Sequence, residues 1–106
     1  MTDYRIPPEV GGDLANATDW YDREGYKGLG ERFLKAFRAH LTQLRQTGEA
    51  HRTFYADYRR ILLKAFPYAL YYRYHGDLLV VALVIHAARN PQLARSKVRG
   101  RLEGDV

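Results

Sequence analysis

The side chains best suited to chemistry gather in residues 66–91, FPYALYYRYHGDLLVVALVIHAARNP. His86 could exchange a proton near neutral pH, and Arg73 and Arg89 could neutralise a phosphate. Acid–base cleavage at a phosphate ester needs a base, cations for the crowded phosphate and an acid for the leaving oxygen. His86, Arg89, Arg73 and Tyr71 are the candidates for these roles, if the fold brings them to one edge of a sheet.

Each of these side chains also has a structural interpretation. His86 could end a strand with its ring hydrogen-bonded near the following turn, and Arg89 could brace the chain after it. Arg73 could be an exposed cross-strand charge, and Tyr71 could pack on a sheet with its hydroxyl in water. The sequence leaves both interpretations open.

The sequence lacks the residues that a metal site or a phosphate loop would need. The remaining histidines are spread over a helix edge (His40), a loop (His51) and a turn (His75), and the chain has no cysteine. We therefore expect no metal and no cofactor. The glycines of residues 25–30 follow a helix and lack the strand and the lysine-serine pair of a phosphate loop.

The composition favours one cytosolic domain with an anionic partner. At 106 residues and 46% apolar content the chain can build a single packed core. The absence of cysteine gives no sign of an oxidising compartment, and the first twenty residues do not resemble a signal peptide. The longest apolar run, residues 78–85, is too short to span a membrane. A net charge of +5 favours nucleic acid, a ribosome, an acidic protein or a membrane surface as partner, and charge alone does not choose among them.

Basic residues are concentrated after the last apolar run. We expect residues 1–91 to form the domain and residues 92–106 to form a basic C-terminal tail. The tail could be a solvated, frayed end or a contact to nucleic acid or a protein partner, and both remain open. Arg89 precedes the tail, and the basic residues within it are Arg95, Lys97, Arg99 and Arg101.

The N-terminal half predicts a strand and two helices. Residues 4–6 precede Pro7 and should be extended. A first helix carries an apolar stripe, but the pair Gly11 and Gly12 weakens its first turn, so it could begin as late as Asp13, with Asp13 as N-cap. The two stripes are Val10, Leu14, Ala17 and Tyr21, then Leu29, Phe33, Ala36, Phe37, His40, Leu41 and Leu44. Gly48 closes the second helix.

The C-terminal half predicts an antiparallel meander of residues 59–66, 68–74 and 78–86, separated by Pro67 and a turn at Gly76. The last strand is apolar on both faces, as expected of a central strand. Strict alternation would place Val80, Ala82 and Val84 on one face and Leu79, Val81, Leu83 and Ile85 on the other. The predicted fold is α+β: an N-terminal strand, a two-helix hairpin and a three-stranded antiparallel meander, giving a mostly antiparallel sheet of four strands.

Short sequence motifs occur at particular places in this order of elements. They are Asp13-Leu14 with Ala17, Trp20-Tyr21-Asp22, Leu29-Gly30 with Phe33, Arg59-Arg60-Ile61-Leu62-Leu63, Phe66-Pro67-Tyr68, Leu70-Tyr71-Tyr72-Arg73 and His86-Ala87-Ala88-Arg89-Asn90-Pro91. Over about residues 4 to 91 the chain resembles the RelE/ParE superfamily of type II toxins. It is most similar to ParE-like members, which include plasmid stabilisation proteins.

The resemblance implies a cytoplasmic toxin that arrests growth and is neutralised by a cognate antitoxin. ParE-like members inhibit DNA gyrase and have no known chemistry of their own, so this is the expected function. RelE-like members cut mRNA on the ribosome, and that alternative would use His86, Arg89, Arg73 and Tyr71 as catalytic residues. A third possibility is a toxin-derived module that binds a partner without being toxic.

The resemblance also implies a surface that contacts the antitoxin. The acidic antitoxin of relatives folds over the toxin, so a margin of the second helical stripe could bind it, and ordinary core packing is the other interpretation of these residues. The antitoxin-binding candidates are Phe33, Phe37, Leu41 and Leu44. The target-binding candidates come from the basic charge of the segment rather than from the resemblance, and they are Arg89, Arg95, Lys97 and Arg99.

Overall fold

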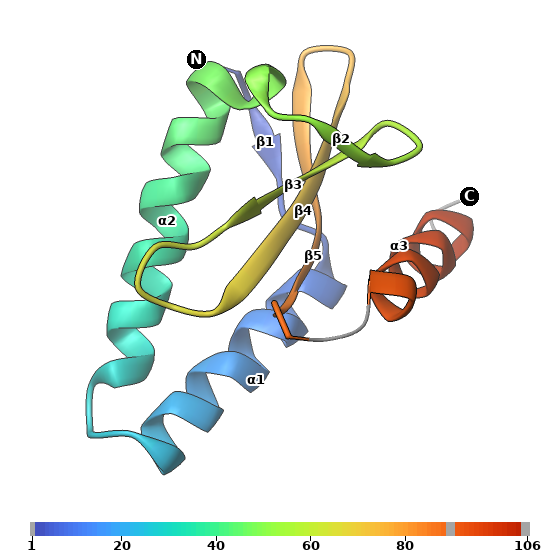
Figure 1. The fold of residues 1–106 in the computed structure, drawn as a ribbon. Helices are drawn as coiled ribbons and strands as arrows, with labels where there is room; N and C mark the ends of the chain where they lie inside the picture. Colours follow the sequence, from blue (N-terminus) through green and yellow to red (C-terminus); the bar gives the residue numbers. More distant parts are fainter. Residues whose placement is uncertain (1, 89–90, 105–106) are drawn as a thin grey trace.

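A β-sheet separates two helical layers in the computed structural model, which describes residues 2–88 and 91–104 (Figure 1). Helices α1 and α2 cover one face of the sheet, and α3 covers part of the other. The elements are β1 (Tyr4–Arg5), α1 (Pro8–Glu24), α2 (Leu29–Thr47), a 3₁₀ turn (Gly48–Ala50), β2 (Thr53–Tyr55), β3 (Tyr58–Leu62), β4 (Tyr68–His75), β5 (Leu78–His86) and α3 (Pro91–Gly104). The predicted α+β class is confirmed.

Helix α1 begins earlier than predicted. Pro8 occupies its first turn, where a missing N–H costs nothing and the fixed φ of proline suits a helix. Val10 is fully buried, so packing holds this turn despite the two glycines that follow it. Asp13 therefore lies inside the helix and is not its N-cap, which corrects the expected start.

Replacing both Gly11 and Gly12 by alanine is expected to raise the free energy of unfolding by about 2 kcal/mol, since each glycine costs a helix about 1 kcal/mol. A Cβ at either position would meet no atom within 4 Å, so nothing opposes the gain. Urea unfolding measures the change. Gly30→Ala is the matched control, because its Cβ would lie 2.7 Å from the Thr18 carbonyl oxygen and should destabilise. A loss of stability in the double variant would contradict the expectation.

The sheet has the order β1-β5-β4-β3-β2. Strand β1 is parallel to β5, and the remaining neighbours are antiparallel, as the predicted meander requires. Two details differ from the prediction. The short strand β2 adds a fifth strand at the edge, and β3 ends at Leu62 rather than at Phe66. The reason for the early end is a turn, in which Ala65 has a φ of 69° before Pro67.

A β-bulge lies in the middle of β5. Leu83 pairs with Tyr71 and Val81 pairs with Tyr72, so Ala82 has no partner of its own. Before the bulge, Leu79 and Val81 face α1 and α2. Beyond it Val84 faces these helices and Leu83 faces α3. The predicted strict alternation is therefore wrong beyond Ala82, because one extra residue reverses which side chains point to each face.

Helix α3 makes the second core layer. Ala94 and Val98 are 1% exposed and pack against Tyr58, Tyr71 and Leu83 on the sheet. Of the two alternatives left open for residues 92–106, the packing of α3 on the sheet disfavours a solvated, frayed end in the described part of this segment. The helix begins at Pro91 and covers most of the segment expected to be a basic tail.

Candidate functional site

His86 lies at the end of β5 on the side of the sheet that faces α1. Its ring is 5.4 Å from that of Tyr68, which packs in the core under α1 and α2. Its Nδ1 accepts a hydrogen bond of 3.1 Å from the backbone N–H of Ala88. The histidine thus occupies the position of a strand end whose ring is bonded near the following turn.

Tyr71 and Arg73 lie on the opposite face, in β4. Tyr71 is 3% exposed, and its hydroxyl accepts a hydrogen bond of 3.0 Å from Nε of Arg60. The Arg73 guanidinium lies 5.3 Å from the ring centre of Tyr58 and 3.9 Å from a carboxylate oxygen of Asp57. The sheet therefore separates these two side chains from the histidine. The fourth predicted catalytic residue, Arg89, is outside the described residues.

The predicted antitoxin-binding stripe is buried. Phe33, Phe37, Leu41 and Leu44 are all between 0% and 7% exposed. The ring of Phe33 lies 5.1 to 5.5 Å from three other rings, those of Tyr21, Phe66 and Tyr68. The sheet covers these four side chains, so a partner could touch them only after they had been uncovered.

The predicted target-binding residues divide between two sides of α3. Arg95 and Arg99 lie toward β2, with their guanidinium carbons 5.3 and 5.8 Å from the ring centres of Phe54 and Tyr55. Lys97 instead lines a groove on the side of α1. Arg89 again lies outside the described residues.

That groove, of about 850 Å³, lies between α1, the end of β5 and α3. Its charged lining is mixed, with the carboxylates Asp13, Asp19 and Asp22 and the cations Arg23 and Lys97. Trp20 also lines it and is 47% exposed, which makes it a large apolar side chain open to a partner. The groove is therefore suited to a peptide segment with both apolar and charged side chains.

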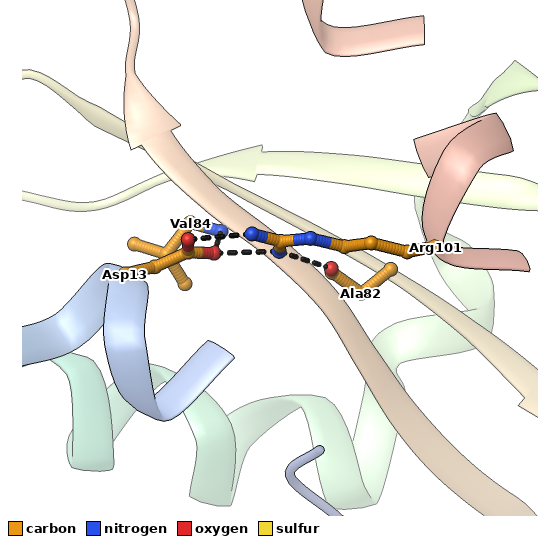
Figure 2. Close-up of polar contacts among 4 residues, drawn as sticks. All are labelled: Asp13, Ala82, Val84 and Arg101. Atoms are coloured by element: carbon orange, nitrogen blue, oxygen red, sulfur yellow. Dashed lines mark hydrogen bonds and ion pairs between the residues drawn. The ribbon is translucent and has the colours of Figure 1, made fainter. Parts of the chain in front are cut away.

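An ion pair that was not among the sequence-based predictions fastens α3 to α1. Figure 2 shows Asp13 facing Arg101, with each carboxylate oxygen 2.7 Å from one guanidinium nitrogen. Their side chains are 14% and 22% exposed. The hydrogen bond to Asp13, the largest influence, raises the pKa of Arg101 above its usual value.

The same pair satisfies the open edge of β5. Strand β1 ends at Arg5, opposite Val80, so the following residues of β5 lack a neighbour on that side. The N–H of Val84 donates to Asp13 at 3.0 Å, and Arg101 donates to the carbonyl of Ala82 at 2.8 Å (Figure 2). Side chains thus replace the hydrogen bonds that a longer β1 would have made.

A weak signal for this pair exists in the sequence. Asp13 falls on the same face of α1 as Val10 and Ala17, three and four residues away, and both are buried. A carboxylate on an apolar stripe predicts a buried partner. Nothing in the sequence identifies that partner as Arg101, which is in a segment expected to be a tail.

His40 is held as a structural acceptor. Its Nε2 accepts a hydrogen bond of 3.0 Å from the backbone N–H of Lys64, which ties α2 to the turn after β3. Burial, and then the charge of Lys64, lower the pKa of His40. Within residues 2–88 and 91–104, no three His, Asp or Glu side chains form a group that could hold a metal ion. None of the helices described is both long enough and apolar enough to cross a membrane.

Comparison with known proteins gives one family. The family model described as "ParE toxin of type II toxin-antitoxin system, parDE" matches residues 4–91. No curated protein matches the chain. Seven chains of solved structures do. One is from "Chromosomal ParDE TA system from P. aeruginosa", with a TM-score of 0.73 and 16% identity over 81% of this chain and 96% of that one. At this identity the similarity concerns the fold.

Proposed function

Because the chain belongs to the ParE toxin family of type II toxin–antitoxin systems, we propose that it arrests growth in the cytoplasm by inhibiting DNA gyrase. A cognate antitoxin holds it inactive until the antitoxin is lost. The observation that carries this proposal is the family match over residues 4–91, which spans every element from β1 to β5.

The geometry of the sheet supports inhibition by binding rather than RNA cleavage. His86 pairs with Tyr68 at one end of β4, and Arg73 lies about 17 Å away along that strand at about 3.4 Å per residue. The two side chains also lie on opposite faces. A base and a phosphate-binding cation must both reach one scissile bond, which this arrangement of His86 and Arg73 does not favour.

The antitoxin site is proposed in the groove beside α1 rather than on the stripe of α2. The groove is open, and Trp20 offers an apolar anchor on its wall. Lys97 and Arg23 would pair with acidic side chains of an antitoxin segment. The stripe residues, by contrast, are already packed under the sheet.

The test is expression without an antitoxin, followed by two parallel assays with the purified protein. The first measures DNA supercoiling by gyrase, and the second measures mRNA integrity in translating ribosomes. Lost supercoiling with intact message is expected. Cleaved message with normal supercoiling would contradict the proposal and make His86 and Arg73 catalytic suspects. Normal growth with both assays unchanged would leave a non-toxic binding module.

A further inference from the structure

The outer face of the sheet and α3 together carry a set of arginines paired with aromatic rings. We call this surface the arginine face. Its members come from the three consecutive strands β2, β3 and β4 and from α3, which follows them later in the chain. The arginines are Arg60, Arg73, Arg95 and Arg99, and the rings beneath them are Tyr71, Tyr58, Phe54 and Tyr55.

Two of these pairs are joined through a contact between their rings. The guanidinium carbon of Arg95 lies 5.3 Å from the ring centre of Phe54, and that ring meets Tyr71 edge to face at 5.0 Å. Arg60 lies 5.8 Å from the Tyr71 ring and also donates to its hydroxyl. Two cations are thus fixed at the two ends of one pair of rings.

The other two pairs extend the surface. Arg99 follows Arg95 by one turn of α3, lies 5.8 Å from the ring of Tyr55 and donates to its hydroxyl at 3.2 Å. The Asp57 carboxylate beside Arg73 is 61% exposed, so its compensation of that charge is weak. In the described part of the chain, no carboxylate lies within ion-pair distance of Arg60 or Arg95.

Ring contacts of this kind prepare a guanidinium for phosphate. An arginine that already lies over a ring loses less side-chain freedom on binding, and its planar fork matches two phosphate oxygens. Several such groups on one face suit a polymer of phosphates better than a single anion. Tyr71 is nearly closed to solvent, and Phe54 and Tyr55 are only partly exposed. The rings therefore position the arginines rather than stack on unpaired bases.

We propose that the arginine face binds the phosphodiester backbone of duplex DNA. An acidic peptide is the less favourable occupant, because it would need an apolar pocket for anchorage and α3 already fills the space over Tyr71 and Leu83. The inference deepens the proposed function, since an inhibitor of gyrase that also holds DNA would contact enzyme and substrate together. The role of this DNA binding in the cell rests on the proposed function, but the binding itself does not.

The experiment measures anisotropy of a labelled 20-base-pair duplex with the full-length protein between about 50 and 200 mM salt. Each phosphate contact contributes about 0.9 to the slope of log affinity against log salt. The triple variant Arg60→Gln, Arg95→Gln, Arg99→Gln should therefore lose about three units of slope and bind at least about tenfold more weakly. If the urea midpoint of the triple variant falls, the double variant Arg95→Gln, Arg99→Gln is measured in its place. This variant changes two exposed side chains of α3.

A charge-matched control separates this face from overall charge. Arg32, Lys35 and Arg38 are exposed on α2, and their replacement by glutamine removes the same charge. The control variant should bind the duplex like the unchanged protein. Equal weakening in both triple variants would overturn the proposal, as would failure of the unchanged protein to bind the duplex.

Two competitors test the identity of the ligand. Single-stranded RNA that binds more tightly than the duplex, or oligoglutamate that displaces it at equal charge, would overturn the assignment to duplex DNA. The outcome is independent of gyrase. Duplex binding with normal supercoiling would support this inference and contradict the proposed function. Inhibition of gyrase without any duplex binding would support the proposed function and contradict this inference.

Discussion

Asp13→Asn is expected to lower the free energy of unfolding by about 3 kcal/mol at most, the lower end of the range for breaking a buried ion pair, because this pair is only partly buried. The substitution leaves the Arg101 guanidinium, 22% exposed, without its counter-charge. It also weakens the acceptor for the N–H of Val84. Urea unfolding, followed by circular dichroism, measures the change.

A double-mutant cycle with Arg101→Met should give a coupling energy of about 1 to 3 kcal/mol, because the two side chains touch directly. The control is Glu31→Gln, which removes a pair with Arg38 at 3.8 Å between side chains that are 74% and 65% exposed. Its effect should stay below about 0.5 kcal/mol. If Asp13→Asn is as mild as this control, the pair does not fasten α3 to α1.

Phe33→Ala is expected to cost about 4 kcal/mol, as removal of a buried phenylalanine does elsewhere. The side chain is fully buried and touches three rings, those of Tyr21, Phe66 and Tyr68. The measurement is again the unfolding free energy, together with antitoxin affinity under conditions in which the variant remains folded.

Trp20→Ala provides the contrast, because this side chain is 47% exposed and should cost less than about 1 kcal/mol. If the groove beside α1 is the antitoxin site, Trp20→Ala weakens antitoxin binding without affecting folding. The opposite pattern, in which Phe33→Ala keeps full stability and loses the antitoxin, would return the antitoxin site to the α2 stripe.

The elements that sequence predicted well have strong periodic patterns. The stripe of α2 and the apolar run of β5 define the helical hairpin and the central strand, and both are confirmed. The family resemblance is confirmed by the match over residues 4–91. Helix α3 was missed because its buried contacts come from small or isolated apolar residues, Ala94 and Val98, in a strongly basic segment.

The candidate site was less predictable because it depends on contacts between distant residues. Asp13 and Arg101 are separated by most of the chain, and no periodicity links them. The arginine face likewise joins Arg60 to Arg95 through two rings from two other elements. Residue types showed which groups were available, but only the packing of α3 determines which of them meet.

The bulge at Ala82 makes the length of β5 a determinant of surface chemistry. Upstream of it the odd-numbered residues point to α1 and α2, and downstream the even-numbered ones do. Had Ala82 been paired regularly, the ring of His86 would have joined the side of Arg73 and Tyr71, and an acid–base group would have stood among the arginines. A single unpaired residue thus decides to which face of the sheet the end of β5 presents its side chains.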